Sequence, residues 1–331
     1  MPTNLHSHRA CAVMSALLLF ANATAAAPSI AADYPTRPIR FVIPFAAGGT
    51  SDIIGRILSA KMHDALGQAL VVDNRGGAGG SIGTDIVAKA TPDGYTILLS
   101  SNGTHAIVPY LYKKLPYDPI KDFEPITMVA ITPQVLAVNP ELPVKSLKEL
   151  IALAKLKPGA LVYASSGVGS MGHISGALMN YMGGIDITHL PYKSAAVAYP
   201  DVFSGRVPVI IDTALSMTQH IKTHRVRPLA VTTAKRALNL PDLPTMSEAG
   251  LTGYASTLWI ALHAPAGTPR PVLARLHKEF TRTLALPEVR EQMALSGAEV
   301  SFGTPAALLA ATHADFKRMA EIVHAAKIEA Q

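Results

Sequence analysis

Short apolar runs alternate with amphipathic segments along almost the whole chain. IRFVIPF, ALVVDN and TPDGYTILLSS, between residues 39 and 101, have the length and residue types of buried strands. Residues 52–66 place apolar side chains at three- and four-residue spacing, which predicts a helix that ends before Gly67. Strands that alternate with helices predict an α/β fold with mainly parallel sheets.

The same alternation returns in the second half of the chain. Residues 146–156 predict a capped helix, and helices are also expected near 270–285 and 305–326. Further buried strands are predicted by LVYASS, ITHLPY, VPVIID and RPLAVTT, and a return strand by STLWIALHAPAGTP. The Pro-rich segment 115–140 contains two short apolar runs, as expected where a chain crosses from one lobe to another.

The first 32 residues have the layout of a secretory signal peptide. One cation, Arg9, precedes the apolar run CAVMSALLLFANATAAA, which is too short and too Ala-rich for a good membrane span. The small residues that follow allow cleavage after Ala27, Ala31 or Ala32. We therefore expect an exported protein, with an uncleaved anchor as the alternative. Cys11 is the only cysteine, so the mature chain would have no disulfide and no thiolate site.

Charge limits the kinds of partner. The formal net charge is +6, but the lysines and arginines are scattered, with no run of four. Nucleic-acid binding requires a clustered basic stripe and stacking aromatic residues, so we expect no nucleic-acid partner. A mildly basic exported protein is better suited to small anions.

Two segments place bare backbone between a strand and a helix. PFAAGGTSD at 44–52 and SSGVGSMGH at 165–173 each follow an apolar run and precede a helical pattern. A helix N-terminus carries about half a positive charge and unpaired N–H donors, so it binds anions without a lysine or arginine. Glycines also let ligand atoms approach the backbone closely. One such unit in each of two lobes would close on a single anion from both sides.

Polar residues near these segments each allow two interpretations. His173 begins a helix, where it contacts either a carboxylate or loop carbonyls. Asp212 ends the strand VPVIID and suits an amine, a hydroxyl or a helix cap. Asp52 is expected to cap a helix start. The polar residues 100–104 either line the same cleft or make a turn.

Catalysis has no support in the sequence. GGSIG at 79–83 matches the G-x-S-x-G motif of hydrolases, but RGGA separates it from the strand that should lead directly into Ser81. The twelve histidines form no H-E-x-x-H motif and no cluster with carboxylates at metal-ligand spacing. We therefore expect no catalytic residue, no metal site and no cofactor, and a secreted serine hydrolase is the weakest hypothesis.

At this point a long series of ordered stretches resembles one family. The chain is similar to the substrate-binding proteins of tripartite tricarboxylate transporters, the TctC or Bug group of periplasmic receptors. The resemblance covers nearly all of residues 34–326. It is carried by YPTRPIRFVIPFAAGGTSDIIGRIL, VVDNRGGAGGSIGTDIVAKATPDGYTILL, LYKKLPYDPIKDFEPIT, YASSGVGSMGH, THLPYKS, LAVTTAKR, LPDLPTMSEAG and LHAPAGTP.

The resemblance implies a two-lobed periplasmic-binding-protein fold, type II-like, with a flytrap cleft between the lobes. On this basis we expect lobe 1 to comprise 33–131 plus 246–331, and lobe 2 to comprise 132–245. It further implies a monomer, located in the periplasm, that delivers a small carboxylate to the permease subunits of a transporter. The alternative is a periplasmic sensor that binds the same ligand and contacts a kinase ectodomain.

The resemblance also implies the ligand-binding residues. One side of the clamp would be Phe45, Ala46, Gly48 and Gly49, and the other Ser165, Ser166, Gly169 and His173. Ser101 and Thr104 would form a side wall, and Asp212 would lie toward the far end of the ligand. Ser194, Thr213 and residues 260–263 depart from the family pattern around the cleft. Ligand identity therefore does not transfer, and di- or tricarboxylates, amino acids and aromatic acids all stay open.

Overall fold

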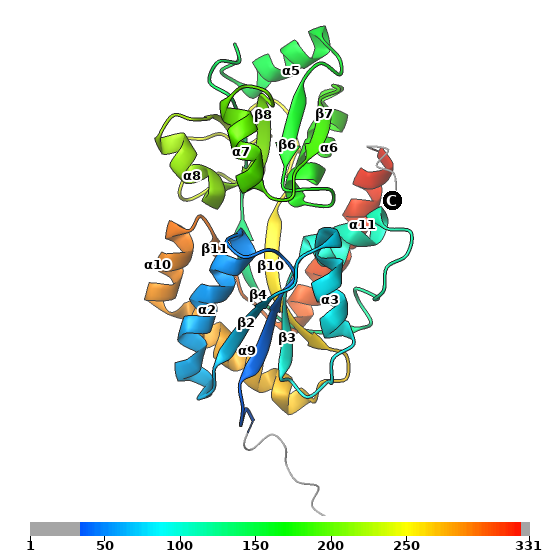
Figure 1. Ribbon diagram of the computed structural model, residues 1–331, viewed down its shortest axis with the longest axis vertical. Coiled ribbons are helices and arrows are strands. Elements are labelled where there is room, and N and C mark those ends of the chain that lie inside the picture. Colours follow the sequence, from blue (N-terminus) through cyan, green and yellow to red (C-terminus); the bar gives the residue numbers. More distant parts are fainter. Residues whose placement is uncertain (1–33, 326–331) are drawn as a thin grey trace, which may run out of the picture. The chain divides into compact units, whose positions relative to one another are not determined.

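The computed structural model describes residues 34–325 (Figure 1). The predicted signal peptide, with its cleavage sites and Cys11, lies outside these residues. No helix within the described range is both long enough and apolar enough to span a membrane.

Sheet A has six strands in the order β11-β4-β10-β3-β1-β2. Their bounds are β1 Ile39–Ile43, β2 Leu70–Asn74, β3 Thr96–Ser101, β4 Phe123–Thr132, β10 Leu258–Pro265 and β11 Glu299–Val300. β1 pairs in parallel with β2 and β3, whereas β10 is antiparallel to β3 and β4, and β11 is antiparallel to β4. The first four strands therefore point the same way, and only β10 and β11 run against them.

Sheet B has five strands in the order β7-β6-β8-β5-β9. Their bounds are β5 Gln134–Val138, β6 Val162–Ser165, β7 Thr188–Pro191, β8 Val209–Thr213 and β9 Arg227–Val231. β6 pairs in parallel with β7 and β8, whereas β5 is antiparallel to β8 and β9. Only β5 runs against the other strands. The predicted α/β fold is confirmed, and most strands in each sheet share one direction, although five of the nine strand pairings are antiparallel.

Helices connect the strands of both sheets (Figure 1). The helices between strands of sheet A, or after its last strand, are α2 Thr50–Leu66, α3 Ser81–Ala88, α4 Val108–Leu111, α9 Arg270–Ala285, α10 Pro287–Leu295 and α11 Pro305–Ala325. Those between strands of sheet B are α5 Leu147–Leu156, α6 Met171–Gly183, α7 Ala195–Phe203 and α8 Ala214–Lys222. A 3₁₀ turn, Ala78–Gly80, precedes α3, and a π-helical turn, Gly103–Ile107, precedes α4.

Local sequence explains the helix that follows β1. α2 buries Ile54, Leu58 and Met62 on one face, as the spacing predicts. It ends at Gly67, whose φ of 70° lets its N–H bond the carbonyl of His63. α5 begins in the expected way at Ser146, whose side chain accepts the N–H of Glu149.

The chain passes between the sheets twice, from β4 to β5 at Pro133 and from β9 to β10. Sheet A takes its strands from 39–132 and 258–300, and sheet B from 134–231. We propose that the lobe limits lie at these crossings. One apolar cluster extends past the crossings, because Leu111 of α4 and Met319 of α11 belong to the same buried group as Leu136 and Ile174.

Candidate functional site

The first predicted loop lies at the carboxyl end of β1. Pro44 is buried, Phe45 is half-buried, and residues 46–49 are exposed. Gly49 is the N-cap residue of α2 and makes no side-chain cap. The N–H groups of the first helical turn lack intrahelical partners, so they are available to an anion from the loop side.

Asp52 holds this loop in place from the first turn of α2. Its Oδ2 accepts the N–H of Gly48 at 2.8 Å and the Nε–H of Arg56 at 3.0 Å. Burial opposes ionisation of this carboxyl, but the Arg56 guanidinium and the Gly48 N–H hold its pKa below the usual value. At the start of α2, Asp52 therefore acts by accepting hydrogen bonds from the Gly48 N–H and the Arg56 side chain.

The second predicted loop lies between β6 and α6. Ser165 is fully buried, whereas Ser166 is exposed. Ser170 is the N-cap of α6, and its Oγ accepts the N–H of His173 at 3.2 Å. The N–H of Gly169 donates to Nδ1 of His173 at 3.3 Å. His173 therefore supports the glycine loop by accepting a backbone N–H, whereas the sequence led us to expect contact with a carboxylate or with loop carbonyls.

A histidine that no sequence motif identifies lies beside this loop. His189 of β7 stacks on His173, with ring centroids 4.1 Å apart, and its Nε2 lies 2.7 Å from Oγ of Ser165. Burial lowers the pKa of His173 to about 4, and burial together with His173 lowers the pKa of His189 to about 3. Both rings are therefore neutral at pH 7, and His189 orients the Ser165 hydroxyl.

The pairing of β7 with β6 places His189 beside Ser165. β7 pairs with β6 so that His189 lies opposite Tyr163, two residues before Ser165. The signal was a polar residue within the apolar run ITHLPY, but only the strand register identifies its partner. Among the described residues no carboxylate hydrogen-bonds His189, so the Ser165–His189 pair lacks the third group of a catalytic triad.

Ser101 and Thr104 lie together where β3 ends. Oγ1 of Thr104 donates to the carbonyl of Ser101 at 3.0 Å, and the N–H of Ser101 donates to Oγ1 of Thr104 at 3.3 Å. A Cβ placed on Gly80 would lie 2.7 Å from Cγ2 of Thr104 and 3.3 Å from Cζ of Phe45. The predicted side wall and the aromatic ring of the first loop therefore meet at Gly80.

Asp212 has a different environment. Its Oδ2 accepts the hydroxyl of Tyr199 of α7 at 2.9 Å, and the N–H of Thr213 and the hydroxyl of Ser216 favour its ionised form. Burial raises its pKa to about 6, despite these hydrogen bonds. The contacts of Asp212 are thus with α7 and the start of α8, and its predicted contact with the ligand stays a prediction.

The first loop contacts the sheet B side of the molecule. Oγ1 of Thr50, the first residue of α2, lies 3.1 Å from Oγ1 of Thr213, the N-cap of α8. A Cβ on Gly103, beside Ser101, would lie 3.9 Å from the carbonyl of Gly169. The starts of α2, α6 and α8 are therefore brought together, and no lysine or arginine is buried within residues 34–325. The buried sources of positive potential at this place are therefore backbone N–H groups and helix dipoles, whereas Arg56, which is paired with Asp52, is exposed.

The remaining chemical candidates do not join this cluster. Ser81 is the buried first residue of α3, and the 3₁₀ turn separates it from β2, as its motif analysis predicts. In the part of the chain that the structure describes, no cluster of histidine, cysteine and carboxylate residues could hold a metal ion.

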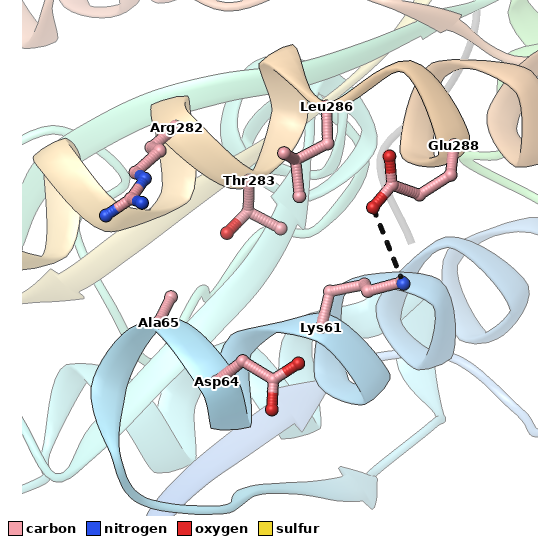
Figure 2. A pocket seen from close by; sticks show the side chains of 7 residues that line it. All are labelled: Lys61, Asp64, Ala65, Arg282, Thr283, Leu286 and Glu288. Carbon is pink, nitrogen blue, oxygen red and sulfur yellow. Dashed lines mark ion pairs between the residues drawn. The ribbon is translucent and has the colours of Figure 1, made fainter.

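One pocket, of about 170 Å³, lies elsewhere, between the C-terminal half of α2 and the segment that joins α9 to α10 (Figure 2). It is lined by Lys61, Asp64, Ala65, Arg282, Thr283, Leu286 and Glu288. The Lys61–Glu288 ion pair, 3.6 Å long, bridges its two sides. The predicted loops are at the opposite end of α2, so this pocket is separate from them.

Comparison with known proteins identifies the family of this chain. Residues 54–328 match the TctC family, described as tripartite tricarboxylate transporter family receptors. Protein BugT of Bordetella pertussis is 37% identical over 289 residues, which cover 87% of this chain and 89% of BugT.

Two solved structures of Rhodopseudomonas palustris proteins are similar along nearly their whole length. Rpa4515 with adipate has a TM-score of 0.86 and 37% identity, covering 90% of this chain and 100% of that one. MatC with bound malate has a TM-score of 0.81 and 31% identity, covering 88% of this chain and 100% of that one. The family is one of receptors and not of enzymes. This chain therefore belongs to the tripartite tricarboxylate transporter family of receptors.

Proposed function

We propose that this chain is a periplasmic solute-binding protein that captures a small carboxylate and delivers it to the permease of a tripartite tricarboxylate-type transporter. Phe45, Ala46, Gly48 and Gly49 form one side of the carboxylate site, and Ser165, Ser166, Gly169 and His173 the other. Ser101 and Thr104 form its wall.

One observation carries this proposal. Two glycine-containing loops, each at the start of a helix and each from a different sheet, both approach the residues that follow β3. Phe45 of the first loop faces Thr104 across Gly80, and the carbonyl of Gly169 in the second loop faces Gly103. No lysine or arginine is buried within residues 34–325. A carboxylate gains hydrogen bonds and dipole stabilisation from such backbone groups. The absence of a salt bridge keeps binding reversible, as a receptor that must release its cargo requires.

The relatives favour dicarboxylates as the class of ligand. Adipate is bound in Rpa4515 and malate in MatC, and both proteins match this chain over almost its full length. We therefore infer that the ligand carries a carboxylate at each end. Periplasmic location follows from the same family and from the predicted signal peptide, and fractionation of cells that express the full-length chain tests it.

A thermal-shift screen tests the proposed function. The purified protein is unfolded and refolded to remove retained ligand, and is then screened against di- and tricarboxylates, amino acids and aromatic acids. A ligand at about one hundred times its Kd adds roughly 2.7 kcal/mol of stability, which raises Tm by several degrees. We expect a selective shift by dicarboxylates. A refolded protein with native circular dichroism and no shift from any acid would contradict the proposal.

A further inference from the structure

Three buried polar side chains have no hydrogen-bond partner where the chain passes from sheet A to sheet B. The atoms are Oγ of Ser101, Oγ1 of Thr132 and Nε2 of Gln134. The three residues are only 1%, 0% and 2% exposed. Buried polar atoms are almost always hydrogen-bonded, and leaving one unpaired costs about 1–3 kcal/mol. Oδ1 of Asn102 is also unpartnered, but the Asn102 amide donates to the carbonyl of Thr257 and to Asp315. The three other atoms therefore need a physical explanation.

The strand pairing relates these residues to one another. Ser101 ends β3 and Thr132 ends β4, and both strands flank β10, where Ser101 pairs with Ile260 and Thr132 with Leu258. Residues directly opposite each other, and residues two apart, lie on the same face of a sheet. Ser101 and Thr132 therefore share one face of sheet A. Gln134 follows Thr132 across the single residue Pro133.

The same residues also connect to both loops of the proposed site. Gln134 pairs with Thr213, whose hydroxyl contacts Thr50 at the end of the first loop. Ser101 lies beside Gly103, which faces the carbonyl of Gly169 in the second loop. The three unpartnered atoms therefore lie along the chain crossing between the two loops.

Their chemistry favours one kind of ligand group. The free atom of Gln134 is an amide nitrogen, which only donates, whereas the hydroxyls of Ser101 and Thr132 can donate or accept. All three can donate to an oxygen acceptor, whereas an ammonium group would find acceptors only in the two hydroxyls and would leave Nε2 of Gln134 unpaired. A carboxylate is the acceptor that gains most from neutral donors shielded from water, because hydrogen bonds to charged groups are the strong ones.

We propose that Ser101, Thr132 and Gln134 form a polar subsite that binds the second carboxylate of a dicarboxylate ligand. Its first carboxylate is held by the two glycine loops. This assignment rests on the proposed function. It makes the site selective for dicarboxylates over monocarboxylates, since a monocarboxylate would leave all three donors unpaired. The subsite disfavours amino acids that end in an ammonium group.

Isosteric variants separate binding from structure. Thr132→Val and Gln134→Met remove the donors while keeping the shape of each side chain. Replacing an unpaired buried polar group by an apolar group of similar shape is neutral or stabilising, so Tm of the ligand-free protein is expected to stay level or rise. Thr127→Val is the matched control, because Thr127 is equally buried in β4 but its hydroxyl donates to the carbonyl of Gly303 at 3.0 Å. This control is expected to lower Tm.

Binding is measured by calorimetry with acids matched in length. Adipate is paired with hexanoate and succinate with butyrate, so that each pair differs only in the far carboxylate. We expect the wild type to prefer the dicarboxylate, and Thr132→Val and Gln134→Met each to weaken dicarboxylate binding about tenfold while leaving the monocarboxylate unchanged. Thr127→Val should leave the ratio of the two affinities at its wild-type value.

The outcomes distinguish this subsite from the proposed function. Equal affinity of the wild type for both members of each pair would overturn the subsite while leaving carboxylate capture intact. Tighter dicarboxylate binding by Thr132→Val or Gln134→Met would also overturn it, because the unpaired atoms would then only oppose closure around the ligand. Binding of no acid by the natively folded wild type would overturn the proposed function itself.

Discussion

Gly48 shows how a single residue in the first loop can be tested without disturbing the fold. Its φ is +80°, and a Cβ added there would meet no atom within 4 Å. Backbone conformation, and not packing, is therefore what disfavours a side chain at this position. Asn and Asp accept the left-handed region better than other residues with a side chain, so these two substitutions carry similar strain.

We predict that Gly48→Asp abolishes carboxylate binding, whereas Gly48→Asn weakens it far less. The two variants are nearly isosteric, and only the first places a negative charge beside the proposed carboxylate. Calorimetry with the best acid from the screen gives the two affinities, and circular dichroism verifies both folds. Equal affinities of the two variants would show that charge at this loop does not matter for binding.

From the raised pKa of Asp212 we predict that the stability of the fold depends on pH. Burial raises its pKa from 3.8 to about 6, so the folded protein disfavours the ionised form. Its contribution to stability is fully present below pH 3.8 and is lost as pH rises through about 6, by about 3 kcal/mol. Asp212→Asn should remove this loss and become relatively more stable than the wild type above pH 6. Urea unfolding from pH 4 to 8 measures it, and parallel curves would contradict the assignment.

At the scale of elements, the His173–His189 stack joins α6 to β7 and predicts acid lability. The pKa of both rings is lowered, to about 4 and about 3, from an ordinary value of 6.5. The stability that they contribute is present above pH 6.5 and is lost as pH falls through about 4, because the unfolded chain binds the protons first.

We predict that His189→Gln reduces this loss between pH 6.5 and pH 4, since glutamine can still bond Ser165 but does not titrate in this range. His63→Gln, at an exposed position of α2, is the control and should follow the wild type. The measurement is the midpoint of urea unfolding at half-unit pH steps. A steeper acid loss in His189→Gln would exclude the stack as its source.

Helix α3 depends on close contact with the residues that directly follow β1 and β2. A Cβ on Gly83 would lie 2.6 Å from the carbonyl oxygen of Arg75 and 2.8 Å from Cα of Pro44. Alanine is the better helix former by about 1 kcal/mol, but these neighbours are backbone atoms that cannot move freely. We predict that Gly83→Ala lowers the free energy of unfolding by roughly 1–3 kcal/mol in denaturant titration. Gly303→Ala, whose Cβ meets only Ala307 at 3.8 Å, should be near neutral.

Most elements followed from local pattern, and the misses have local causes. The spacing of apolar residues predicted α2 to within two residues of its start, and both glycine loops were found at strand ends. α7 was missed because Pro200 lies inside it. α8 and α10 were missed because each buries only two residues, Ala214 and Met217 in α8 and Val289 and Met293 in α10, which leaves little apolar periodicity. His189 and the Thr50–Thr213 contact could not be predicted, because they depend on strand register and on the approach of two distant helix starts.

At the scale of the whole molecule, two kinds of contact join the part built on sheet A to the part built on sheet B: an apolar cluster and a few polar contacts near the first loop. The buried cluster with Leu111, Ile174 and Met319 is apolar and extends across the crossing. Between the first loop and α8 the contacts are few and local, such as the Thr50–Thr213 hydroxyl pair. A Cβ on Gly297, before β11, would also lie 2.7 Å from the backbone nitrogen of Leu215 in α8. Apolar packing is non-directional, whereas these polar contacts need one arrangement, so we infer that the side where α2 meets α8 is the one that opens.

This difference predicts the effect of Thr50→Val on ligand binding. The hydroxyl of Thr50 bonds that of Thr213, and valine keeps the shape of the side chain but not the hydrogen bond. A net hydrogen bond is worth about 0.5–1.5 kcal/mol, so the closed arrangement should be disfavoured and the Kd for the carboxylate should rise roughly two- to tenfold. Calorimetry provides the Kd, and the Tm without ligand should fall by no more than a few degrees, because only one hydrogen bond is lost and Thr50 does not cap α2. Thr218→Val, which removes a hydroxyl bonded within α8 to the carbonyl of Ala214, is the control and should bind as the wild type does. An unchanged Kd in Thr50→Val would mean that the contact between α2 and α8 makes no contribution to closure around the ligand.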